Sequence, residues 1–438
     1  MRPEAAPGLR LIPVALTVNP RVQARGSACH PRWLLAAPHR LGFFAAALMF
    51  AGSAAWWAAL LLAGSMGYSP NWMVPPAAAH ALLMSLSFMP LFIVGFLFTA
   101  GPRWLGQPAV NARALLLPVL TMLLGWWVTV PGFHLQAMMA GAGMLLVSLG
   151  WSRLCLRFIQ LVRSSRVPDR MHASLVALAC TVGAVTMWLS AFALLTDRFA
   201  LLRAATQVAL WCFVASVVAT VSHRMIPFFS ANVLPRLDAW RPNWLLWASL
   251  AALWLEAPFA VAQIWWWPLP AGLRWIQFTI EMGAALLLLW LALRWGLLQS
   301  LKIRLLAMLH GGFLWLGISF ALAAVSHALM ALSDGRWSLG LAPLHALTMG
   351  YLGATLFAMA TRVSSGHGGR PLAADDPAWA LYWLLQTAVL LRVLAAIWPD
   401  LGPAPTLLAA LAWVAATLGW AVRYGNWFLR PRADGRPG

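Results

Sequence analysis

Long apolar stretches alternate with short polar connections along most of the chain. A membrane-spanning helix needs about 20 mostly apolar residues, and twelve stretches of this kind follow one another from residue 41 onward. The connections between them are short, which places the functional groups within or between helices. We expect the helices at residues 41–63, 76–100, 112–131, 134–151, 172–196, 202–222, 243–264, 271–298, 305–332, 338–362, 378–398 and 404–427.

This pattern predicts an all-α fold, a polytopic membrane helix bundle. We expect residues 1–40 to form an arginine-rich N-terminal tail, residues 41–428 the twelve-helix transmembrane domain and residues 429–438 a C-terminal tail. The N-terminal tail is long and contains prolines, and the apolar block after it is about as long as a full span. Signal peptides have a shorter apolar region, so we interpret this block as the first transmembrane helix.

Composition and charge support a membrane protein and argue against a nucleic-acid partner. Hydrophobic residues make up 62% of the 438 residues and charged residues 9%. The net charge of +19 would suit nucleic acid if it were clustered, but 25 of the 30 lysines and arginines lie in the tails and on alternate connections. The positive-inside rule then predicts both termini in the cytoplasm, and the lipid bilayer is the expected partner.

The four cysteines suggest neither a disulfide framework nor a zinc ribbon, because no two of them have C-x-x-C spacing. The chain also lacks the C-x-x-C-H motif that attaches c-type haem covalently.

The histidines fall into two layers when each is placed by its distance from a helix end. Four lie within one or two turns of the outer face, on the order of 10 Å into the apolar layer. This outer layer consists of His80, His134, His327 and His345. A second polar level at the inner face consists of His223, Arg224, His310, Arg362 and His367.

Two similar motifs in the outer layer are candidates for metal or haem ligands. HALLM begins at His80 and HALTM at His345, and each puts a methionine, Met84 or Met349, one helical turn further on. Imidazoles on neighbouring helices bind haem iron or copper, and a thioether can join them. His327, in a similar HALM, could belong to the same layer. The chain has 18 methionines, so core packing is an alternative role for both methionines.

The segment from residue 345 to residue 372 connects the two layers. His345, Thr348 and Met349 share one face if this segment is an α-helix. The segment ends in the G-H-G-G-R run at residues 366–370, which offers free backbone N–H groups. Arg224 and Arg362 could bind an anionic group such as haem propionates. Arginines at cytoplasmic helix ends are also what membrane orientation alone requires.

Two intramembrane carboxyl groups, Glu256 and Glu281, lie at a similar depth to Arg392 in the outer half of the predicted bundle. Ionisable groups in this position are costly and often functional, so the two glutamates are candidates for a proton relay. A buried structural Glu–Arg pair is the alternative.

Several segments resemble one known family. They are HALTMGYLGATLFAMATRVSSGHGGRPL (345–372), HALLMSLSFMPLFIVGFLFTAGPRWLGQP (80–108), SHRMIPFFSANVL (222–234) and LHGGFLWLG (309–317). Together they resemble NnrS, a bacterial inner-membrane family that contains haem and copper and is linked to nitric oxide and denitrification. The resemblance implies non-covalent b-type haem, possible copper binding and a role around nitric oxide or iron-nitrosyl species.

Matched position by position, the resemblance supports seven cofactor-binding candidates. These are His80, Arg224, His310, His345, Arg362, His367 and Arg370. The chain departs from the family where His-x-His-Glu commonly begins the second helix, because Leu82 and Leu83 follow His80 here. The departure implies less bound metal or a different partner for His80.

Two other classes of protein fit the same pattern. A secondary transporter with twelve helices would be expected to show repeats and interrupted helices. A structural assembly factor for a respiratory complex would bind a protein partner and no cofactor. The residues alone assign no catalytic reaction and identify no protein partner.

Overall fold

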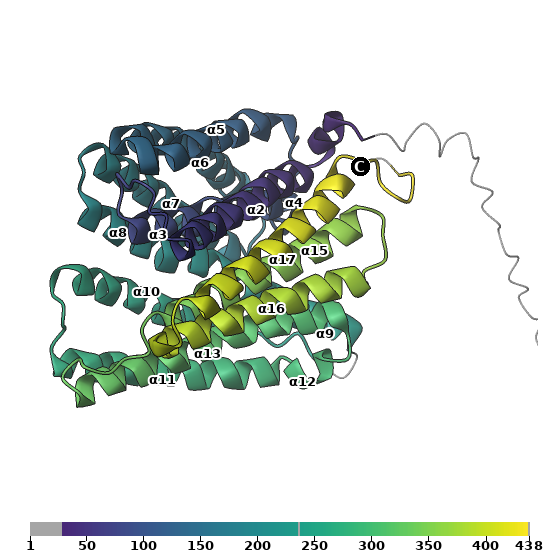
Figure 1. The fold of residues 1–438 in the computed structure, drawn as a ribbon. Helices are drawn as coiled ribbons and strands as arrows, with labels where there is room; N and C mark the ends of the chain where they lie inside the picture. Colours follow the sequence, from purple (N-terminus) through teal and green to yellow (C-terminus); the bar gives the residue numbers. More distant parts are fainter. Residues whose placement is uncertain (1–28, 235–236, 437–438) are drawn as a thin grey trace, which may run out of the picture.

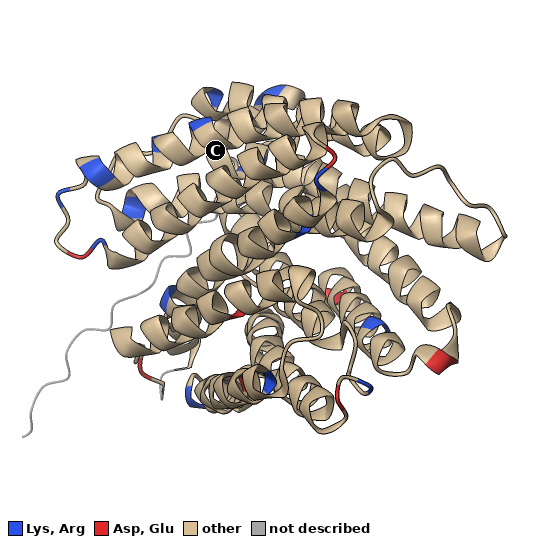
Figure 2. Ribbon diagram, turned by 90° about the vertical axis from the view of Figure 1, so that its left-hand side faces the viewer, with Lys and Arg blue, Asp and Glu red and all other residues tan. Residues whose placement is uncertain are grey.

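The computed structural model describes residues 29–234 and 237–436, so most of the expected N-terminal tail lies outside the described residues. The described residues form helices and connections, with no strand among them. Twelve helices are long and apolar enough to cross a membrane, which confirms the predicted all-α polytopic fold. Figure 2 shows that charged residues are sparse and that most of the helical ribbon carries none.

The twelve spans comprise seventeen helical elements. They are α2 (Pro38–Ser65), α3 (Pro76–Leu86) with α4 (Met89–Trp104), α5 (Arg113–Leu135), α6 (Ala137–Ser164), α7 (Met171–Leu195), α8 (Phe199–Val208) with η2 (Ala209–Ala215) and α9 (Ser216–Val233), α10 (Asn243–Trp265), α11 (Ala271–Arg294), α13 (Arg304–Leu332), α14 (Ala342–His345) with η3 (Ala346–Gly353) and α15 (Ala354–His367), α16 (Asp376–Ile397) and α17 (Ala404–Phe428). Three short helices complete the described fold, namely η1 (Pro31–Ala36), α12 (Leu297–Ser300) and η4 (Pro399–Leu401).

Some helix ends differ from the sequence prediction. The fourth span continues to Ser164, well beyond residue 151, because its last turns carry arginines that an apolar window excludes. The sixth span continues through Pro227 to Val233, whereas the prolines after residue 222 predicted a connection. The first span begins at Pro38, inside the predicted tail. Pro at a first helical position loses no intrahelical hydrogen bond, so it favours a helix start.

Three of the twelve spans are interrupted near their middle. The second bends at Ser87 and Phe88 between α3 and α4, and the sixth and tenth contain the π-helical segments η2 and η3. These three are also the most enclosed spans. Buried residues make up 83%, 78% and 72% of their most apolar windows, against 28–50% in the other nine. The interrupted spans therefore form the centre of the bundle.

The interrupted spans recur at every fourth helix, and the packing around them repeats in the same order. Each packs against the span before it, namely the first, fifth or ninth. The fourth, eighth and twelfth spans pack in turn against the fifth, ninth and first. This order divides the bundle into three consecutive four-helix units. It also gives the HALLM and HALTM motifs, eight helices apart, corresponding places in the first and third units.

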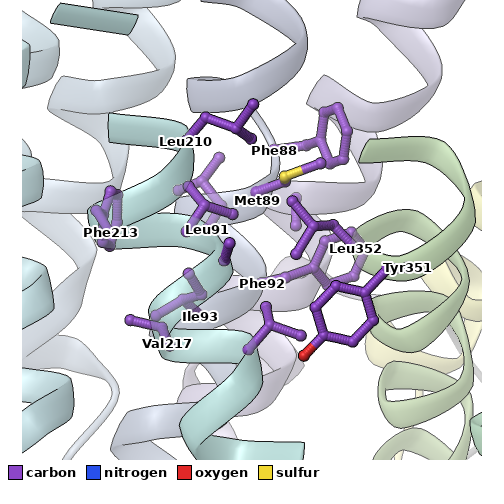
Figure 3. Close-up of a cluster of buried hydrophobic side chains, with 14 of the residues drawn as sticks. Phe88, Met89, Leu91, Phe92, Ile93, Leu210, Phe213, Val217, Tyr351 and Leu352 are labelled. Carbon is purple, nitrogen blue, oxygen red and sulfur yellow. The ribbon is translucent and has the colours of Figure 1, made fainter. Parts of the chain in front are cut away.

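The central contact joins all three interrupted spans (Figure 3). Leu210 and Phe213 of η2 lie on one side of the start of α4, and Tyr351 and Leu352 of η3 lie on the other. Phe92 and its neighbours on α4 fill the space between them, and all of these side chains are buried. The Tyr351 hydroxyl also lies 3.4 Å from Ser222 Oγ, which links the tenth span to the sixth.

The two described ends of the chain lie side by side at one end of the bundle (Figure 1). The backbone N–H of His30 donates to Leu429 O over 2.9 Å, and Arg40 Nη1 donates to Arg430 O over 2.6 Å. The first and last spans are therefore fixed to each other at this end.

Small residues allow close contact between neighbouring helices. Lipid offers no hydrophobic drive for helices to associate, so glycines that permit close backbone approach are important at such contacts. A Cβ placed on Gly125 of α5 would lie 2.6 Å from Gly143 O of α6 and 2.7 Å from a Val147 methyl group. Thr129 also donates to Ala140 O across this contact, over 3.3 Å.

We predict that Gly125→Leu lowers the unfolding temperature in detergent, because overpacking a tight contact costs about 1–3 kcal/mol. Thermal unfolding followed by size-exclusion chromatography measures the change. The matched control is Gly283→Leu on α11, where a Cβ would meet no atom within 4 Å. Equal unfolding temperatures for the two variants would contradict the packing described for α5 and α6.

Candidate functional site

The structure brings His80 and His345 together near one end of the bundle. His80 lies on α3 and His345 is the last residue of α14, so the pair joins the second and tenth spans. His345 and Arg392 are close enough to His80 to interact with its imidazole electrostatically. The His80 ring lies against the Trp57 ring, with centroids 4.1 Å apart and a tilt of 37°, and its Nδ1 is buried with no hydrogen-bond partner among the described residues.

The hydrogen bond of His345 leaves one ring nitrogen available. A carbonyl can only accept, so Nδ1 of His345 carries the proton and donates to Leu341 O over 2.9 Å. Nε2 then carries a lone pair, and it has no hydrogen bond within the described part of the chain. Metal-binding histidines commonly have this arrangement, because the second-shell carbonyl fixes both the tautomer and the ring orientation.

The π-helix η3 begins directly after His345. A π-helix is paired i→i+5, and such segments are frequent at functional sites. The expected common face of His345, Thr348 and Met349 assumed α-helical spacing, which η3 does not have. Thr348 Oγ1 donates to Leu344 O over 2.9 Å, and Met84 and Met349 are partly buried against the apolar core.

His327 lies with the intramembrane carboxyl groups. Its Nδ1 is 2.8 Å from Glu281 Oε2, and Glu256 interacts with both of these residues. Arg392 lies instead beside His80 and His345. Neither glutamate forms an ion pair with Arg392 in the described structure, so the basic partner of Glu281 is a histidine.

His134 has both ring nitrogens occupied. Trp56 Nε1 donates to Nε2 over 3.2 Å, which leaves Nδ1 as the donor to Asn71 O over 2.8 Å. Of the four histidines predicted in the outer layer, His134 and His327 are therefore engaged by protein groups. His80 and His345 form a pair with free nitrogens, which we call the open pair.

At the opposite end, His172 and His223 form a hydrogen-bonded pair. His223 Nε2 donates to Pro242 O over 3.2 Å, so its Nδ1 accepts from His172 Nε2 over 3.0 Å. His172 was not among the sequence-predicted site residues. The contact joins the start of α7 to α9. The two histidines are 51 residues apart in the sequence, and no local motif indicates their contact.

His367 lies against His39, with ring centroids 4.8 Å apart and a tilt of 41° between the rings. Both rings interact electrostatically with Arg103 and Arg432. His39 is also buried, and its Nδ1 has no partner among the described residues. Sequence reasoning missed His39 because the residue was placed in the tail, although Pro38 is a signal for a helix start.

His310 does not share a contact with His367. Its Nε2 lies 2.9 Å from Ser230 Oγ, and its Nδ1 is buried without a partner in the described chain. The predicted inner site is thus distributed over separate contacts.

The inner arginines lie over aromatic rings. Arg224 lies 5.1 Å from the Trp104 ring centroid, and Arg362 lies 3.9 Å from that of Phe229. Arg370 lies 3.9 Å from the Trp427 ring centroid in the connection after α15. Burial, followed by the charges of Arg423 and Arg430, lowers the pKa of Arg370 from its ordinary value. These cation–π contacts account for the positions of all three guanidinium groups.

No group of three or more His, Cys, Asp or Glu side chains that could hold a metal ion occurs among the described residues. The open pair therefore offers two protein nitrogens, a number suited to the axial positions of haem iron. A copper ion at this place would need further ligands, such as the thioethers of Met84 and Met349.

Comparison with known protein families identifies the relatives of the chain. The family model described as NnrS protein matches residues 33–432, which covers all twelve spans and both members of the open pair. No match is found among curated proteins. The chain belongs to the NnrS protein family.

Proposed function

We propose that this protein binds haem at the open pair and acts in the response to nitric oxide or nitrosative stress, or in support of denitrification. The observation that carries the proposal is the open pair itself: two histidines from central spans, with nitrogens that no described protein group engages. The link to nitric oxide rests on the family resemblance.

The donor chemistry of the two histidines fits b-type haem. Helices fix the directions of His80 and His345, and neutral imidazole nitrogens are common axial ligands of haem iron. The buried Nδ1 of His80 has no partner among the described residues, and an unpaired buried polar atom costs free energy. When bound, haem supplies a redox-active iron.

Three groups around the open pair would help to orient the two imidazoles or to bind the haem. The Leu341 carbonyl holds the proton at Nδ1 of His345 and so directs Nε2 toward a ligand. Trp57 fixes the plane of the His80 ring. Arg392 brings a positive charge to the pair, where a guanidinium group can bind an anionic substituent.

Copper is the second metal that the open pair could take, with Met84 and Met349 as soft ligands. His327, the third histidine predicted as a metal ligand, is hydrogen-bonded to Glu281 and is not part of this proposed site. The alternative haem site lies at the inner level and would use His310 and His367 with Arg224, Arg362 and Arg370.

We predict that His80→Gln and His345→Gln each remove or strongly shift the haem bands of the purified protein, because each variant deletes one axial nitrogen. Absorbance spectra with metal analysis of haem-replete preparations measure the effect. The matched control is His367→Gln, at the other end of the tenth span, which should keep the spectrum.

Two results would contradict this prediction. The absence of any haem band in the folded, haem-replete wild type would exclude haem binding. Equal spectral losses from His345→Gln and His367→Gln would contradict the separation of the two histidine levels.

A secondary transporter is the second candidate, and the three interrupted spans favour it because transporters place substrate at broken helices. In the sixth and tenth spans, however, the interruption is a π-helix and not an unwound segment. Transport of a solute that persists when the histidines are replaced would support this class. An assembly factor would instead co-purify with a respiratory complex and carry no cofactor.

We also propose that the protein lies in the bacterial inner membrane with both termini in the cytoplasm, because 25 of the 30 lysines and arginines would then be on the cytoplasmic side.

We predict that a C-terminal fusion to green fluorescent protein is fluorescent and that the matching alkaline phosphatase fusion is inactive. The same two reporters inserted at the connection that contains η4 should give the opposite result, because one span separates the two positions. An active phosphatase at the C-terminus would overturn the proposed orientation.

A further inference from the structure

Three buried ionisable side chains and one partly buried histidine gather on three helices that carry neither histidine of the open pair. They are Glu256 of α10, Arg274 and Glu281 of α11, and His327 of α13. Glu281 is 0% exposed and Glu256 is 7% exposed, so both carboxyl groups are shielded from solvent. We call Glu256, Glu281 and His327 the carboxylate cluster.

The contacts within the cluster are short and specific. His327 Nδ1 lies 2.8 Å from Glu281 Oε2, and the Glu256 carboxyl group adjoins Glu281. On its other side, His327 Nε2 faces Gln263 Nε2 at 3.4 Å. Gln263 can only donate there, so Nε2 accepts and Nδ1–H donates to Glu281. This assignment makes His327 neutral and Glu281 the hydrogen-bond acceptor.

Arg274 does not neutralise the two carboxyl groups through an ion pair in the described structure. Its Nη1 donates to Met330 O over 2.6 Å, and it acts on His327 through its charge. The guanidinium group therefore serves to fix the end of α13. Arg274, His327 and the two glutamates are the charged or titratable groups that interact across α10, α11 and α13.

Two buried oxygens of the cluster region lack a donor. Glu281 Oε1 has no hydrogen-bond partner among the described residues, and neither has Oε1 of Gln277. The two residues are one turn apart on α11 and so lie on the same face. A buried acceptor without a donor costs roughly 1–3 kcal/mol of folding free energy. An additional proton on one of the carboxyl groups would supply a hydrogen-bond donor at this place.

Repulsion between the two carboxylates indicates that one of them carries this hydrogen. Two adjacent carboxylates in an apolar site cannot both be ionised without a large cost, and such pairs commonly share one proton. A proton on Glu256 or Glu281 removes one charge and supplies a donor. The pair then titrates as a unit, and the Nδ1–H of His327 donates to Glu281.

We propose that the carboxylate cluster is a proton-binding site, in which Glu256 and Glu281 share one exchangeable proton and His327 donates a hydrogen bond to Glu281. The proposal goes beyond haem binding and shares no residue with the open pair. The site is nevertheless connected to the pair through packing, because α13, which carries His327, packs against α14, which carries His345.

Infrared spectroscopy of the full-length protein in lipid nanodiscs tests this proposal. A protonated carboxyl group has a C=O stretching band distinct from that of a carboxylate. The chain contains three glutamates, Glu4, Glu256 and Glu281, so side-chain 13C-glutamate can assign the band without any substitution. We expect a glutamic acid band at neutral pH that shifts with the isotope and in heavy water, and that decreases as pH rises.

Variants locate the proton. The band should be unchanged in Glu4→Gln, altered in Glu256→Gln or Glu281→Gln, and lost when both are replaced. Its appearance in haem-free wild type as well would separate this proposal from haem binding. The isotope experiment on the wild type remains decisive if a variant fails to fold.

Two outcomes would overturn the proposal. The first is the absence of any protonated glutamic acid band in folded wild type at neutral pH. The second is a band that disappears when sodium replaces choline at constant ionic strength, which would make the cluster a site for a metal cation.

Discussion

In a bilayer, every backbone polar group must find its partner within the protein, and this constraint determines where helices can be interrupted. The bend at Ser87 and the π-helices η2 and η3 are acceptable because other helices enclose them. The backbone stays paired at the bend, where Ser87 N–H donates to Leu83 O over 3.1 Å and Phe92 N–H donates to Phe88 O over 3.0 Å. The nine surrounding spans therefore protect an irregular centre from lipid.

The irregular centre positions the open pair. His80 precedes the bend in the second span, and His345 immediately precedes η3 in the tenth. Because the two spans occupy corresponding places in the first and third four-helix units, their histidines reach the same level. The two other histidines predicted in the same layer are engaged by protein groups: His134 uses both nitrogens, and His327 faces a carboxyl group. Within this layer, hydrogen bonding distinguishes the open pair.

Much of the fold could be predicted from the sequence because membrane spans are a property of local composition. The apolar windows identified all twelve spans. The π-helices could not be predicted in this way, because the hydropathy of a segment does not depend on whether its backbone is an α-helix or a π-helix. Their effect on the spacing between His345 and Met349 was missed for the same reason.

Partners of the site residues were harder to predict than their depth. Glu281 and Arg392 were expected at the same depth in the bundle. In the structure, Glu281 is instead paired with His327, and Arg392 lies near the open pair. His39 and His367 are in contact although 328 residues separate them in the sequence, and no local pattern encodes such a contact. Depth is a one-dimensional property, whereas pairing depends on which helices are neighbours.

Electron paramagnetic resonance of the oxidised, haem-replete protein tests most directly whether His80 and His345 bind one iron together. The open pair predicts a low-spin ferric signal typical of two imidazole ligands, lost or converted to high spin in His345→Gln. A wild-type signal that is high-spin, or that survives unchanged in His345→Gln, would contradict axial binding at the open pair.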